Sequence, residues 1–159
     1  MERLKKLEDI CQPDERNQNR VDIDHSTGAV TQTSIESIYA VVEGIRLNDK
    51  VPDDVRSCFE VARNLALYSW FVYSFQEVAA MQALAALEMA ARNKTGEDKT
   101  AFKNLLDKLF QGRQFAPELS LAKAVSNFRN EFAHGSIMRS GQGLFFVRMC
   151  SEWINELFS

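Results

Sequence analysis

Residues 78–91 read Val-Ala-Ala-Met-Gln-Ala-Leu-Ala-Ala-Leu-Glu-Met-Ala-Ala, and Gln82 and Glu88 are the only polar side chains among them. Ala, Leu and Met are strong helix formers, and the segment contains neither glycine nor proline. A helix that is apolar on nearly every side has to be covered from several directions. The segment therefore predicts a central helix inside a bundle of other helices.

Helix signals continue on both sides of this segment. Pro52 and Pro117 are each followed by an acidic residue, a combination typical of a helix start, and Gly135 is suited to the position just after a helix end. Apolar residues recur at spacings of three and four between these signals. We therefore expect helices over residues 33–47, 55–73, 74–93, 99–110, 117–134 and 144–158, while residues 1–11 have the pattern of a short amphipathic helix.

The expected fold class is all-α, with five to six helices, short connections, an up-and-down core and a short C-terminal helix. Residues 1–50 are expected to form an N-terminal helix and a polar arm, and residues 51–159 the helical domain. Residues 12–31 are polar and rich in turn-forming types, which is typical of a loop or a mobile arm. The β-branched residues near Ile38 leave a strand open as the alternative there.

Composition limits the classes of function. The 159 residues are 45% hydrophobic and 26% charged, with a net charge of −3, so no global positive charge attracts nucleic acid. Cys11, Cys58 and Cys150 are far apart, which predicts reduced thiols rather than disulfides or a zinc site. We find no signal for a secretory leader or a membrane span, and expect a cytoplasmic protein with no metal and no cofactor.

The helix expected over residues 117–134 has two different faces. Leu121, Val125, Phe128 and Phe132 follow one another at steps of four, three and four, and so form a single apolar stripe. Arg129 lies at the edge of that stripe, while Asn130 and His134 lie one turn apart on the opposite side. Packing therefore does not account for Asn130 or His134, which are expected to face solvent or a second subunit.

Arg129, Asn130 and His134 have side chains suited to phosphodiester chemistry. A guanidinium can bind a phosphate with two hydrogen bonds, and an imidazole can exchange a proton near neutral pH. Asn130 lies four residues before His134 and is placed to orient the ring. The alternative is a surface ion pair at Arg129 and a histidine stabilised by the helix end.

Two further residues support this group. Glu88 is a carboxylate in an otherwise apolar helix and therefore needs a partner, either Arg92 one turn later or Arg129 on another helix. Arg139, in the loop after the motif, is a candidate contact to RNA phosphate, with simple solvation as the alternative. Both choices stay open at this point.

The run Arg129-Asn130-Glu131-Phe132-Ala133-His134 in a late helix resembles the Arg-polar-x-x-x-His motif of the HEPN superfamily. The segment Ala85–Arg92 is also similar to a helix found in several HEPN proteins. The resemblance covers residues 51–159 and implies a HEPN-like helical domain.

The resemblance further implies a metal-independent endoribonuclease in a defence or toxin–antitoxin role. In such an enzyme the ribose 2′-hydroxyl attacks phosphorus and leaves a cyclic phosphate. His134 would act as acid or base, Arg129 would hold the phosphate, and Asn130 would orient either. The composite site would lie between two copies of the chain in a homodimer. The alternative is an inactive HEPN-like module that docks a nucleotide or a protein partner such as an antitoxin or nucleotidyltransferase.

Overall fold

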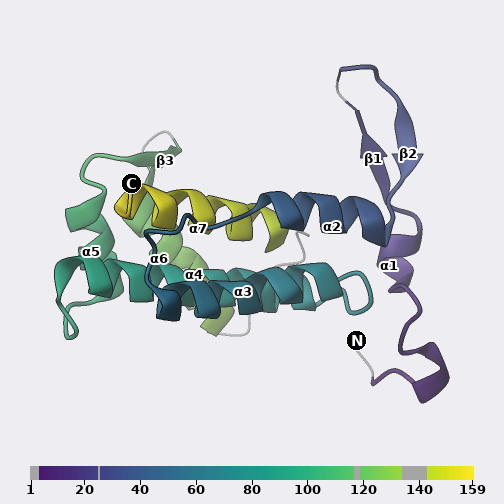
Figure 1. Ribbon diagram of the computed structural model, residues 1–159, viewed down its shortest axis with the longest axis horizontal. Coiled ribbons are helices and arrows are strands. Elements are labelled where there is room, and N and C mark those ends of the chain that lie inside the picture. Colours follow the sequence, from purple (N-terminus) through teal and green to yellow (C-terminus); the bar gives the residue numbers. More distant parts are fainter. Residues whose placement is uncertain (1–3, 25, 117–118, 134–142) are drawn as a thin grey trace.

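The computed structural model describes residues 4–24, 26–116, 119–133 and 143–159, which are mostly helical (Figure 1). The described residues form a 3-10 turn (Leu7–Asp9), seven α-helices and two small hairpins. In chain order after the turn, the elements are α1 (Glu15–Gln18), β1 (Val21–Ile23), β2 (Val30–Gln32), α2 (Ile35–Gly44), α3 (Asp53–Tyr68), α4 (Phe75–Thr95), α5 (Phe102–Leu109), β3 (Gln114–Ala116), β4 (Leu119–Ser120), α6 (Leu121–Ala133) and α7 (Gly143–Leu157).

The helix α4 is the centre of the molecule, as its composition predicts. It packs most extensively against α3 and α7 and also touches α5 and α6. Its alanines let these neighbours approach closely, and Ala79, Ala83, Ala86 and Ala90 are fully buried. Ile38 and Val42 of α2 belong to the same hydrophobic core.

The helices α4 and α7 run parallel to each other. Their first turns touch, since a Cβ atom added at Gly143 would lie 2.1 Å from the backbone oxygen of Gln76. Their last turns also meet, where the ammonium of Lys94 lies 5.5 Å from the ring centre of Phe158, just after α7. This arrangement departs from the predicted up-and-down core.

The polar segment at residues 12–31, predicted to be a loop or mobile arm, instead contains the short helix α1 and strands of a hairpin in its described residues. In α1 the amide of the buried Asn17 donates to the backbone oxygens of Ser69 and Trp70 at 2.9 and 3.0 Å. Asp14 caps α1 and also accepts from the backbone N–H of Tyr73. These bonds attach α1 to the turn between α3 and α4, far away in sequence.

After α1 the chain forms the hairpin β1–β2, which stands away from the helices at one end of the molecule (Figure 1). Its base is fixed by Asp22, which accepts from the hydroxyls of Thr33 at 3.0 Å and Ser37 at 2.8 Å. Asp24 accepts from both the N–H and the hydroxyl of Ser26 in the connecting loop. The hairpin is therefore anchored by side chains whose pairing no periodicity reveals.

Other predictions need correction in detail. The described part of residues 1–11 has only a 3-10 turn, because Leu4 and Leu7 have no apolar surface to cover them. The helix expected from residue 117 begins at Leu121, after the strands β3 and β4. The two hairpins make the all-α class too strict, and α7 is a long core helix of 15 residues rather than a short one.

Candidate functional site

One face of α6 is packed into the core. Leu121 and Val125 are buried, and the ring of Phe128 lies edge-on between Phe146 at 4.5 Å and Phe115 at 6.0 Å. These three members of the predicted stripe are confirmed. The side chain of Phe132, the fourth member, lies outside the described part of the chain.

Arg129, at the edge of this packed face, and Asn130, on the opposite side of α6, are both exposed. The Arg129 side chain is 47% exposed and its Nη1 lies 2.9 Å from Oε2 of Glu88 on α4. Its guanidinium carbon also lies 5.7 Å from the ring centre of Phe102, at the start of α5. Three helices therefore position this guanidinium while leaving about half of it open to solvent.

Glu88 binds both of its candidate partners, Arg92 and Arg129. Its Oε1 accepts from Nη2 of Arg92 at 2.6 Å, while its Oε2 faces Arg129. The carboxylate is well shielded, since the Glu88 side chain is only 18% exposed. Two guanidinium groups thus share one carboxylate, and the group Glu88, Arg92 and Arg129 carries a net charge of +1.

Arg92 is held from a second direction. Its Nη1 donates to the backbone oxygens of Glu97 at 3.0 Å and Asp98 at 2.5 Å, just beyond the end of α4. Gly96 makes this possible by taking the left-handed conformation (φ 69°) that ends the helix. Arg92 is therefore fixed and in turn fixes Glu88, against which Arg129 rests.

His134 and Arg139 lie outside the described residues. The helix α6 is described up to Ala133, the residue immediately before His134. The structure thus brings Arg129, Glu88 and Arg92 together. Asn130 directly follows Arg129 in the sequence and is exposed.

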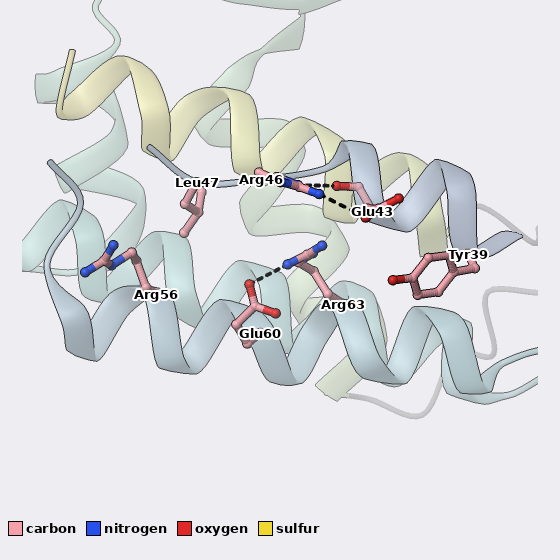
Figure 2. A pocket seen from close by; sticks show the side chains of 7 residues that line it. All are labelled: Tyr39, Glu43, Arg46, Leu47, Arg56, Glu60 and Arg63. Carbon is pink, nitrogen blue, oxygen red and sulfur yellow. Dashed lines mark hydrogen bonds and ion pairs between the residues drawn. The ribbon is translucent and has the colours of Figure 1, made fainter. Parts of the chain in front are cut away.

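A second group of charged residues, which the sequence did not reveal, lines a cavity of about 370 Å³ between α2 and α3. Figure 2 shows Arg46 and Glu43 on one side of it and Arg63 and Glu60 on the other. Tyr39, Leu47 and Arg56 complete the lining. Arg56 and Arg63 lie on α3 and Arg46 lies just after α2, so their proximity is a tertiary feature that sequence spacing does not reveal.

Each arginine of this groove is paired with at least one carboxylate, and Arg56 also lies 3.6 Å from Asp49. Arg46 donates to Glu43 at 3.1 Å and Arg63 to Glu60 at 2.5 Å. Arg56 pairs with Asp53, and that hydrogen bond raises the pKa of the Arg56 guanidinium. Arg63 also donates through Nε and Nη2 to the backbone oxygen of Val42, near the end of α2. Arg63 therefore joins α3 to α2, and every arginine of the groove has its charge balanced by a carboxylate.

Within the described ranges no group of three or more His, Cys, Asp or Glu side chains is arranged to hold a metal ion. Nor does any described helix have the length and hydrophobicity needed to cross a bilayer. No protein-family model matches the chain, and no curated protein or solved structure matches it significantly. The function therefore has to be argued from the residues themselves.

Proposed function

We propose that the chain is a HEPN-like, metal-independent endoribonuclease with Arg129, Asn130 and His134 as its catalytic residues. The observation that carries this proposal is the shared carboxylate of Glu88. Because Arg92 and Arg129 both bind it, one positive charge is not neutralised, and the exposed half of Arg129 is where an anion meets that charge. A phosphodiester is such an anion, and a guanidinium already held in place loses little conformational freedom on binding it.

The proposed reaction is an internal transfer at phosphorus. The ribose 2′-oxygen bonds to the phosphorus as the bond to the 5′-oxygen breaks, which leaves a cyclic phosphate on one product. A base removes the proton of the 2′-hydroxyl, and an acid donates a proton to the departing 5′-oxygen. His134 from each of two copies would supply these two groups, with Arg129 stabilising the charge on the phosphate and Asn130 orienting it or the imidazole.

Support for a shared site comes from the spacing of the two residues in the sequence. Five positions on an ideal helix, the separation of Arg129 and His134, correspond to about 140° in direction and about 7.5 Å in rise. A pair of facing α6 helices would bring an arginine and a histidine to one phosphate more easily than a single helix does. A homodimer in a defence or toxin–antitoxin role is the biological setting that goes with this proposal.

The test is RNA cleavage by the purified chain in EDTA, with a substrate carrying a single ribonucleotide in DNA. We expect cleavage after that ribonucleotide and a cyclic phosphate product, and no cleavage of the all-deoxy strand. His134→Ala and Arg129→Ala should each lower the rate by at least about 100-fold. Arg46→Ala is the matched control, because it removes an exposed arginine whose charge is already balanced.

A binding module is the second candidate, and the ion pair at Arg129 favours it, because a carboxylate 2.9 Å away competes with any bound phosphate. In that case the charged face of α6 would dock a protein partner such as an antitoxin or a nucleotidyltransferase. Wild-type protein that leaves RNA intact, yet binds such a partner in a manner that Arg129→Ala abolishes, would establish the module and reject the nuclease.

A further inference from the structure

The cavity between β3 and α7 is lined by side chains that suit a flat aromatic ring. Its volume is about 290 Å³, near the lower end of the range for small-ligand pockets. Phe115 lines it from β3 and Phe145 from α7, with the buried Met149 and Trp153 beside them. Phe145 is 53% exposed although it is a large aromatic residue. A ring stacked here would remove this apolar surface from water.

The aromatic side chains of the cavity are held in place by other rings of the fold. The ring of Phe145 meets Phe146 edge-on, with the ring centres 5.6 Å apart. The ring of Phe115 meets Phe128 in the same way at 6.0 Å. Because these rings already have partners, a ligand that stacks on them loses little free energy in ordering them.

Three charged side chains line the same cavity, and one of them is already neutralised. Nη1 of Arg113 lies 2.6 Å from Oε2 of Glu156, which is outside the lining. Arg148 and Glu152 are exposed and lie one turn apart on α7, yet neither forms an ion pair with any residue in the described ranges. An arginine four residues before a glutamate is the less favourable order for a helical pair. The guanidinium and the carboxylate are therefore both available to a ligand.

A guanine base has hydrogen-bonding groups that match this pair. Its O6 and N7 are two neighbouring acceptors, which a guanidinium binds with two parallel hydrogen bonds. Its N1–H and 2-amino group are two neighbouring donors, which a carboxylate accepts with its two oxygens. Adenine, cytosine and uracil each lack such a pair of neighbouring donor groups. An aromatic cavity that is also lined by Arg148 and Glu152 thus favours guanine among the bases.

We infer that this cavity binds a guanine base stacked against Phe145, with Arg148 donating to O6 and N7 and Glu152 accepting from N1–H and the 2-amino group. Arg129 and Asn130 are not part of the lining, so the inference does not depend on RNA cleavage. The base belongs either to a free guanine nucleotide or to a guanosine within RNA, since both present the same two edges.

The test is calorimetric titration of the full chain with guanosine, inosine, adenosine and tryptophan. Nucleosides are used because they carry no phosphate that could bind to an arginine elsewhere. We expect guanosine to bind at least about tenfold more tightly than adenosine. Inosine lacks the 2-amino group and should bind roughly fivefold more weakly than guanosine. Tryptophan, an aromatic ring with an ammonium and a carboxylate, should not bind.

Three variants connect this preference to individual side chains, all of them exposed, so circular dichroism should show unchanged helix content. Phe145→Ala should weaken guanosine and inosine equally, by roughly tenfold, because both stack. Glu152→Ala should leave guanosine and inosine with equal affinity, because the 2-amino group has lost its acceptor. Arg148→Ala should abolish the preference for guanosine over 7-deazaguanosine, which lacks the N7 acceptor. Glu43→Ala is the matched control, since it removes a half-exposed glutamate from the groove between α2 and α3.

A 2′-O-methylated oligonucleotide of uridines with a single guanosine separates the two sources of the base and resists the proposed cleavage. Tighter binding of this strand than of GMP assigns the site to RNA, and binding no tighter assigns it to a free nucleotide. The inference is overturned if neither guanosine nor the strand binds, if guanosine and adenosine bind equally, or if tryptophan binds instead. A guanosine-to-inosine ratio that Glu152→Ala leaves unchanged would also overturn it.

Discussion

The Arg129 site and the groove between α2 and α3 use the same residue types with different charge balance. In the groove Arg46 and Arg63 each have a separate carboxylate, Arg56 has both Asp53 and Asp49, and Glu60 is 54% exposed. At the site two arginines share Glu88, which is 18% exposed.

A count of arginines therefore does not locate an anion site. One-to-one pairs near solvent cancel their charges and contribute little to stability, so the groove holds helices together without attracting a phosphate. A shielded carboxylate with two guanidinium partners leaves a local excess of charge even in a chain whose net charge is −3. The two regions differ in the number of arginines per carboxylate and in how far the carboxylate is buried. The following variants change one or the other.

The largest effect is expected from Glu88→Gln. Removing the charge leaves two guanidinium groups facing each other across a shielded amide, which should lower the free energy of unfolding by about 2–3 kcal/mol. Glu60→Gln in the groove should cost less than about 1 kcal/mol. Urea denaturation of both variants measures the difference, and equal losses would show that sharing and burial of Glu88 have no energetic consequence.

Asp14 is a second shielded carboxylate for comparison: it pairs with Arg16, and the Asp14 side chain is 11% exposed. The side-chain hydrogen bond from Arg16 lowers the pKa of Asp14 to about 2. A lowered pKa stabilises the fold above the unfolded value near 4 and loses that contribution as pH falls toward 2, about 2 kcal/mol in all. Asp14→Asn should lose this stability at neutral pH and show a shallower acid titration; an unchanged titration contradicts the assignment.

Arg92→Gln leaves Arg129 as the one arginine paired with Glu88, as in the ion pairs of the groove. Its stability should fall by about 1 kcal/mol, through the bonds to Glu88 and to the backbone oxygens of Glu97 and Asp98. If excess charge serves the cleavage reaction, the rate should fall roughly tenfold, which corresponds to about 1.4 kcal/mol of electrostatic stabilisation. A full rate in this variant would mean that Arg129 needs no second guanidinium.

The smallest effect is expected from Arg46→Gln. Its pair with Glu43 is exposed on both sides, so the free energy of unfolding should change by less than about 0.5 kcal/mol. Repeating the urea titration in high salt should reduce even that difference, since exposed charges are screened. A loss comparable to that of Glu88→Gln would remove the distinction between the two regions.

Local patterns were sufficient to predict the helical core. The uninterrupted apolar run at residues 78–91 predicts a central helix, and α4 is that helix. The spacing of Leu121, Val125 and Phe128 predicts the buried side of α6 and hence the exposure of Asn130 on the opposite side. Such predictions succeed because helical periodicity is set by residues three and four apart.

Features that depend on distant partners were not predictable. The hairpin β1–β2 is stabilised by Asp22 through Thr33 and Ser37, and α1 by the contact of Asn17 with Ser69 and Trp70. Glu88 left two choices open because one partner is on its own helix and the other on α6. The structure realises both, since a carboxylate has two oxygens.

The parallel contact of α4 with α7 bears on the order of events during synthesis. The helices α3 and α4 are joined by a short turn and can pair as soon as both have emerged, because local contacts form fastest. The second apolar side of α4 has to wait for α7, which begins at Gly143, after α5 and α6 have been made. Until then the alanine-rich surface beside Gln76 stays uncovered, and the growing chain is most exposed to aggregation at this stage.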